Sequence, residues 1–201
     1  MKKKPTAAEL MAQLNSDPEF VRKRDQEDEE RQNRAVEWAH AEEPLVAELR
    51  AAGFEVNSAW DLVNTETPYH EALPILMDHL TRPYPGPVRE GIARALAVRP
   101  ARSAWNVLTS LYRQEQDKRA KSGLAAAIAA TSDDEVVEDL IALVRDRQNG
   151  SSRLLLLGGL ERSKSPRARA VLMELGTDPD LEKEIQIILR RLKRPGGMTI
   201  R

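Results

Sequence analysis

Aliphatic residues recur at a fixed interval of 32 residues from residue 67 onward. Three columns carry the repeat: Leu76, Leu108, Leu140 and Leu172; Ile92, Leu124, Leu156 and Ile188; and Leu96, Ile128, Leu160 and Leu192. In each copy the first column falls in one segment, while the other two lie four residues apart, or one helical turn, in a second segment. The pattern therefore predicts four helix pairs over residues 67–194, with these columns as their core.

Capping signals agree with this register. Thr67-Pro68, Ser165-Pro166 and Asp178-Pro179 have the cap-plus-proline pattern of helix starts, and Ser132 with Glu135 has the spacing of a capping box. Together with glycines in the breaks, these signals predict eight helices over residues 68–81, 87–98, 101–114, 117–130, 133–147, 151–162, 166–175 and 179–193.

The residues before the repeats have a different pattern. Residues 1–43 are expected to form a charged helical arm, because residues 22–34 contain no large apolar side chain. This arm is expected to be a solvated helix or a specific docking element. Residues 44–66, with a short helix over 58–63, are expected to form an irregular helix pair that caps the repeats. Residues 195–201 are expected to be a flexible tail.

The repeat resembles a known helical family. The segment Ala72-Leu73-Pro74-Ile75-Leu76, followed after a turn by Pro87-Val88-Arg89-Glu90-Gly91-Ile92-Ala93-Arg94-Ala95-Leu96, is similar to a HEAT repeat. The motif positions of tetratricopeptide and ankyrin repeats are absent. The resemblance implies an all-α fold, a right-handed α-α superhelix of about four HEAT-like helix pairs with an irregular N-terminal helix pair.

The same resemblance implies a role for one basic column. Arg89, Lys121 and Arg153 correspond to the basic residue that, in HEAT proteins, belongs to a structural polar ladder. The acidic partner expected six residues earlier is present only as Glu115. The column is therefore interpreted as an incomplete structural ladder, with ligand contact as the alternative.

Composition limits the possible functions. Thirty-one basic and 32 acidic residues provide no overall field that would attract nucleic acid or an anionic membrane. Aromatic residues make up only 4%, which favours helices over sheets. The chain has no cysteine and no apolar run long enough to cross a membrane, so we expect a cytoplasmic protein that is neither secreted nor membrane-spanning.

Signals for catalysis are weak. His40, His70 and His79 lack the spacing of a helical metal pair, so surface positions are expected for them. The chain has no Gly-rich phosphate loop and no nucleophile elbow. We therefore expect a binding protein rather than an enzyme, with no catalytic, cofactor-binding or metal-binding residues. A single catalytic aspartate in a cleft remains the enzymatic alternative.

Nucleic-acid binding is also weighed, because some HEAT-like proteins are DNA glycosylases of the alkylpurine type that hold a duplex on a basic concave face. Here the only dense basic patch is Arg190, Arg191, Lys193 and Arg194, so nucleic acid is the less favoured partner. Bilin lyases also use such repeats and form a second alternative.

The favoured hypothesis is a protein-binding adaptor or scaffold that uses the concave face of the repeats. Helical periodicity predicts that this face lies along the second helix of each pair and contains Glu90, Arg94, Ala126, Leu154, Gly158 and Arg190. A face with small, mildly apolar residues at its centre and charged edges is suited to a helix or an extended peptide with acidic flanks. The alternative is that the chain's own N-terminal helices cover Leu154.

Overall fold

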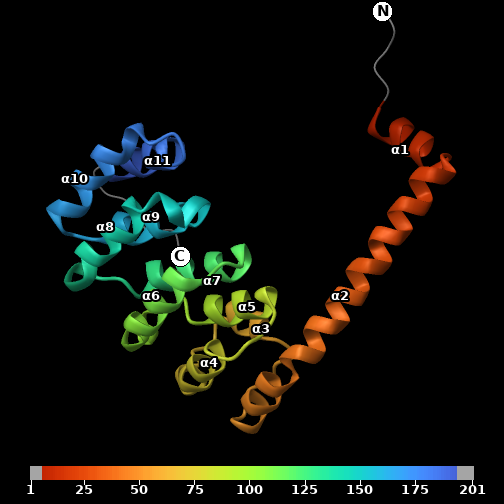
Figure 1. Cartoon of the computed structure of the whole chain (residues 1–201), viewed down its shortest axis with the longest axis horizontal. Coiled ribbons are helices and arrows are strands. Elements are labelled where there is room, and N and C mark those ends of the chain that lie inside the picture. The colour runs from red at the N-terminus through yellow and green to blue at the C-terminus, as the bar shows by residue number, and fades with distance from the viewer. Residues whose placement is uncertain (1–5, 194–201) are drawn as a thin grey trace, which may run out of the picture. The chain divides into compact units, whose positions relative to one another are not determined.

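The computed structural model describes residues 6–193, and in this part of the chain it contains helices and no strand (Figure 1). This confirms the all-α fold class. The α-helices within these residues are α1 (Ala7–Asn15), α2 (Pro18–Ala51), α3 (Ala59–Val63), α4 (Leu73–Leu80), α5 (Gly86–Ala95), α6 (Trp105–Gln114), α7 (Lys118–Thr131), α8 (Val137–Arg145), α9 (Arg153–Arg162), α10 (Pro166–Glu174) and α11 (Glu182–Lys193). The tail expected over residues 195–201 lies outside the described residues.

The chain forms two units that divide at Ala41 and Glu42, inside α2. In the N-terminal unit, Thr6 and Glu9 form a capping box at the start of α1. Residues 6–41 include no buried side chain, as expected from the missing apolar stripe. An ion pair between Glu30 and Arg34 is present at 3.5 Å. This part of α2 is therefore held by its own backbone hydrogen bonds and by local charge pairs.

The helix α2 continues without interruption through the expected boundary between residues 43 and 44, although Pro44 lies inside it. Its buried side chains begin at Glu42. The Glu42 carboxylate accepts hydrogen bonds from the Ala59 backbone N–H at 2.6 Å and from the Ser58 hydroxyl. This carboxylate satisfies donors at the start of α3, and so it ties the second part of α2 to the expected short helix.

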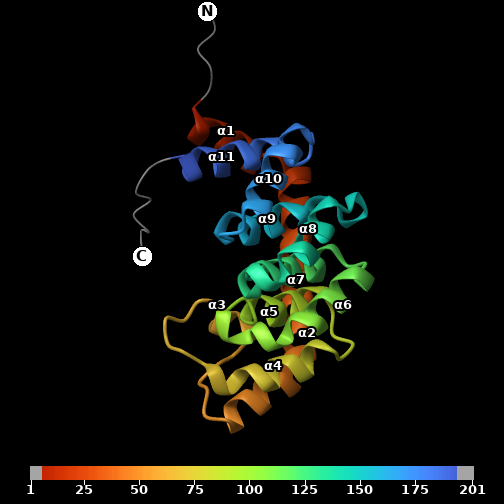
Figure 2. The ribbon, with the colours of Figure 1, turned by 90° about the vertical axis from the view of Figure 1, so that its left-hand side faces the viewer.

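In the second unit, the helices after α3 pack in pairs. The helices α4, α6, α8 and α10, termed the first helices, contact α5, α7, α9 and α11, termed the second helices. The second helices also contact one another in order, α5 with α7, α7 with α9 and α9 with α11 (Figure 2). Neighbouring pairs in the sequence are therefore neighbours in space.

The predicted aliphatic columns form the core of this unit. The described side chains of the three columns are buried except Leu192, which is 37% exposed near the end of α11. Trp105 is buried like Leu73 and Val137, with which it aligns at the 32-residue interval. The interval therefore identified core positions correctly up to the last turn of the last helix.

Three of the four capping signals do not start an α-helix where predicted, and the helix predicted from residue 101 begins at Trp105, after a 3₁₀ segment (Arg99–Ala104). Residues after Thr67-Pro68 form a 3₁₀ turn (His70–Ala72) before α4, and α11 begins at Glu182 rather than at Pro179. Asp133, not Ser132, caps the turn before α8, because the Ser132 hydroxyl donates its hydrogen bond to the carbonyl of Ala129. Ser165 caps α10 as predicted. Local capping patterns compete with side-chain bonds to the preceding helix, which a short sequence window does not reveal.

Glycine in one column brings the first two second helices close together. A Cβ atom added to Gly123 would lie 2.7 Å from the carbonyl oxygen of Glu90 and 3.1 Å from the Cβ atom of Ala93, both on α5. The same column contains Leu155 in α9 and Ile187 in α11. Both of these larger side chains are exposed, Leu155 by 38% and Ile187 by 41%.

This packing predicts opposite effects for two glycine substitutions. Gly123→Ala is expected to lower the free energy of unfolding by about 1 to 3 kcal/mol, because the new methyl group meets backbone atoms that cannot rotate away. Gly158→Ala is expected to raise it by up to about 1 kcal/mol, because the added Cβ atom makes only an ordinary 3.6 Å contact with Arg162. Urea unfolding followed by circular dichroism checks this, and changes of the same sign would contradict the packing.

Candidate binding surface

The six residues predicted from the sequence, termed the candidate surface, lie on the four successive second helices. At the α5 end, Arg94 donates a hydrogen bond to Glu90 at 3.0 Å. The guanidinium of Arg94 also lies 5.8 Å from the ring centroid of Trp60, in cation–π range. Charge at this end is therefore largely internally compensated.

At the centre of the candidate surface the side chains are small. Ala126 on α7 and Gly158 on α9 are partly exposed, and neither has a polar side chain to offer a ligand. Beside them Leu154 and Leu155 are 37% and 38% exposed. Two adjacent leucines that stay exposed on a packed helix are unusual, because one face of such a helix normally takes all the large apolar residues.

Toward α11 the surface combines apolar and basic groups. Ile187 is 41% exposed. Arg190 is exposed and makes no ion pair within residues 6–193, whereas Arg191 pairs with Glu161 at 3.4 Å. The α9 and α11 part of the surface thus exposes three aliphatic side chains, Leu154, Leu155 and Ile187, and an uncompensated cation on the same helix as Ile187.

Sequence reasoning missed Leu155, Ile187 and Trp60 as members of this region. The signal for the first two was present, because they align with Gly91 and Gly123 at the 32-residue interval and a large residue in a glycine column changes the helix spacing. No repeat signal identified Trp60, because α3 precedes the repeats. The Trp60 ring packs where a Cβ atom on Gly91 would lie, with its Nε1 atom only 2.8 Å from that position.

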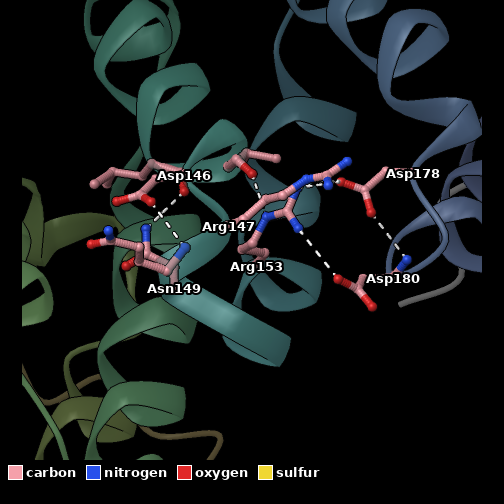
Figure 3. Close-up of polar contacts among 9 residues, drawn as sticks. Asp146, Arg147, Asn149, Arg153, Asp178 and Asp180 are labelled. Carbon is pink, nitrogen blue, oxygen red and sulfur yellow. Dashed lines mark hydrogen bonds and ion pairs between the residues drawn. The ribbon is translucent and has the colours of Figure 1, made fainter.

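The two arginines of the basic column form contacts between successive pairs, not within one pair. Arg89 pairs with Glu115, which is 26 residues later, and the sequence-based assignment of Glu115 to Lys121 is wrong. Arg153 is fully buried and donates to Asp178 at 2.7 Å, 25 residues later (Figure 3). Glu115 and Asp178 occupy corresponding turns before a second helix, so each arginine reaches into the next helix pair.

The Arg153 environment is almost completely closed. Its Nε atom donates to the carbonyl of Val144 at 2.6 Å, and its Nη1 atom lies 3.9 Å from Asp180 without a hydrogen bond (Figure 3). The hydrogen bond from Arg153, followed by one from the backbone N–H of Asp180, lowers the pKa of Asp178. The buried carboxylate is therefore stabilised in its ionised form, and the pair cross-links the third and fourth helix pairs.

The middle member of the column differs. The Lys121 ammonium lies 5.0 Å from the ring centroid of Tyr112 and makes no ion pair in the described part of the chain. The Tyr112 hydroxyl is bonded to Ser152 at 2.7 Å. Burial raises the pKa of Tyr112 to about 12, so the phenol is neutral and serves as a hydrogen-bonding core residue.

One histidine contradicts the expectation of surface positions. His79 is fully buried, with Nε2 at 2.7 Å from the Glu48 carboxylate and Nδ1 at 2.7 Å from the Tyr84 hydroxyl. Its ring also stacks on Tyr84. These contacts join α2, α4 and the loop after α4. His40 and His70 are exposed, as expected.

A polar cavity of about 340 Å³ lies where α7 and α9 end. Arg102 is neutralised there by Asp133 and Glu135, each at 2.5 Å. Arg162 donates to the carbonyl of Ala129, although its pKa is lowered first by partial burial and then by Arg99. Cations at helix C-termini stabilise the exposed carbonyls, so helix capping accounts for this cluster.

Comparisons with known proteins identify no relative: no family model, curated protein or solved structure matches the chain. In residues 6–193 no three histidine, aspartate or glutamate side chains are grouped so that they could hold a metal ion. None of the described helices is both long enough and apolar enough to cross a membrane.

Proposed function

We propose that this chain is a protein-binding adaptor or scaffold built from four HEAT-like helix pairs, and that it binds a peptide segment of its partner along the second helices. The packing of α4 to α11 supports a superhelix. The second helices contact each other in unbroken order, whereas contacts between first helices are sparse and are concentrated between α8 and α10. A stack of helix pairs curves when the helices on one side are closer together than those on the other. The second helices would then line the concave side.

The observation that carries the proposal is the exposure of Leu154, Leu155 and Ile187 on two second helices that pack on each other, with Arg190 one turn after Ile187. A ligand with an apolar face would bury these three aliphatic side chains, and burial of apolar surface favours binding. The unpaired guanidinium of Arg190 favours a carboxylate at the edge of that face. The preferred ligand is therefore an amphipathic helix with apolar residues at i, i+3 and i+4 and an acidic flank.

The pattern of charge disfavours the DNA-binding alternative. Duplex binding needs several uncompensated cations along one face. On the candidate surface Arg94 is paired with Glu90, and the neighbouring Arg191 is paired with Glu161. The central residues, Ala126 and Gly158, are small, so the centre of the candidate surface has no aromatic side chain that could stack on a base.

The test selects ligands from a phage-displayed library of short peptides on the wild-type chain and measures their dissociation constants by fluorescence anisotropy. Leu154→Asp combined with Arg190→Glu is expected to weaken binding at least about tenfold, because it removes the apolar contact and reverses the charge. The matched control is Val107→Asp with Arg113→Glu on α6, which changes a valine of similar exposure and another exposed arginine.

Circular dichroism must show that both doubly substituted proteins keep the wild-type helicity and melting temperature. Selection of helical peptides with acidic flanks, bound by wild type and control alike, supports the proposal. Equal affinity for the Leu154→Asp/Arg190→Glu protein contradicts it. Salt-dependent binding of duplex DNA that is lost with the same substitutions would favour the DNA-binding alternative instead.

A further inference from the structure

The packing of the second helices defines which of their positions face the following pair. On α5, a Cβ atom at Gly86 would collide with the Asp117 side chain, and Glu90 and Ala93 lie against Gly123 of α7. All three contacts point from one pair to the next. Gly86, Glu90 and Ala93 therefore lie on the face of α5 that packs against α7.

The later second helices repeat this arrangement. The carbonyl of Ala129 on α7 lies 3.4 Å from where a Cβ atom on Gly159 of α9 would be. Glu161 on α9, 32 residues after Ala129, reaches Arg191 on α11 at 3.4 Å. The contacts between successive second helices thus fall at four positions per helix, at relative spacings of 0, 4, 7 and 11 residues, which form one stripe along a helix.

In the last pair the corresponding residues, termed the end stripe, are Glu182, Gln186, Leu189 and Lys193. No later helix pair in the described chain covers them. Leu189 is partly exposed, whereas the aligned Leu157 of α9 is fully buried. On α10, which packs on α11, Met173 is 58% exposed, whereas the aligned Ile141 on α8 is 2% exposed. The fourth pair therefore exposes apolar side chains at two positions that the third pair buries.

The charges of the end stripe are self-complementary. Glu182 begins α11 and Lys193 ends it, and neither side chain forms an ion pair within residues 6–193. The midpoint of the stripe falls between Ile187 and Ile188. Reversing the helix about this point exchanges Glu182 with Lys193 and Gln186 with Leu189. A second α11 laid antiparallel on the first would therefore place opposite charges together at both ends, whereas a parallel copy would oppose like charges.

We propose that the end stripe is the interface of a two-fold symmetric homodimer, in which α11 of one protomer packs antiparallel against α11 of its partner. A two-fold interface uses the same patch on both copies, as this charge pattern requires. Burial of Leu189 and Met173 supplies the apolar contact, and the two Glu182–Lys193 pairs determine the orientation. The end stripe shares no residue with the candidate surface, although Gln186 lies in the same 32-residue column as Leu154 and one turn from Arg190. The two proposals are tested with different variants and different measurements, so either can fail alone.

The test measures the dimer dissociation constant of the full chain by sedimentation equilibrium. Glu182→Lys and Lys193→Glu are each expected to weaken dimerisation roughly tenfold or more, because each replaces two attractive pairs by two repulsive ones. Mixing the two variants restores opposite charges at both ends of an antiparallel pair, so the mixture is expected to form heterodimers with about the wild-type affinity. The protein carrying both changes is expected to form homodimers again.

Arg113→Glu on α6 is the charge-reversal control and is expected to leave the dissociation constant unchanged. Leu189→Asp is expected to give monomers with unchanged circular dichroism. A wild-type chain that stays monomeric at the highest soluble concentration overturns the proposal, whether the end stripe is bare or covered by another segment of the chain. A dimer that tolerates both single charge reversals and Leu189→Asp overturns it as well.

Discussion

Replacing Leu156 by alanine is expected to lower the free energy of unfolding by about 2 to 5 kcal/mol, whereas the same replacement at Leu155 is expected to cost less than about 1 kcal/mol. The two residues are adjacent on α9, but Leu156 is fully buried and Leu155 is 38% exposed. A shortened side chain leaves a cavity only where neighbours surround it on all sides. The two variants make the same substitution on the same helix, so the difference between them measures the effect of burial.

The measurement is urea unfolding followed by circular dichroism at 222 nm, with the slope of the transition compared between variants. Leu108→Ala and Leu140→Ala, in another buried column, are expected to give losses of the same size as Leu156→Ala. Equal effects at Leu155 and Leu156 would show that the packing of α9 differs from the one described.

Arg153→Met is expected to lower the free energy of unfolding by about 3 to 5 kcal/mol, since it leaves the buried carboxylate of Asp178 without its cation. Arg147→Met is the matched control: the Arg147 guanidinium lies 3.7 Å from the same carboxylate, but its side chain is 75% exposed, so the expected loss is less than about 1 kcal/mol. Adding Asp178→Asn to Arg153→Met is expected to recover part of the loss, because the buried charge is removed.

The same pair predicts a pH dependence. The pKa of Asp178 is lowered in the folded chain by Arg153, so its contribution to stability is present above the pKa of an unfolded aspartate, about 3.9. The contribution is lost as the pH falls below that value toward the folded pKa. The stability difference between wild type and Arg153→Met is therefore expected to shrink as the pH is lowered from 7 to 3. A difference that stays constant over this range would contradict a charged interaction.

Much of the fold could be predicted from the sequence because burial in helix pairs follows a local period. Leu76, Leu108 and Leu140 are buried since each repeat must hide one apolar face, and a 32-residue interval identifies that face without knowledge of neighbours. The capping signal at Ser165 was also sufficient, because its hydrogen bond stays within one turn.

Contacts between pairs could not be predicted in the same way. Spacing assigned Glu115 to Lys121, six residues away, but Glu115 pairs with Arg89 of the preceding helix pair. His79 gave no signal of burial, because its partners Glu48 and Tyr84 lie on α2 and in a loop. These partners depend on how successive helices stack. The repeat interval cannot identify them, because it describes each helix pair separately.

The amino-acid sequence by itself determined that the chain is all-helical and which columns are buried, because those properties depend on periodicity within single helices. Only the tertiary structure decided which apolar residues remain exposed. Leu192 follows the core column but lies 37% exposed at the end of the last helix, and Leu155 is exposed where Gly123 is covered. Exposure depends on the distance to the next helix, and that distance is determined by side chains on both helices together.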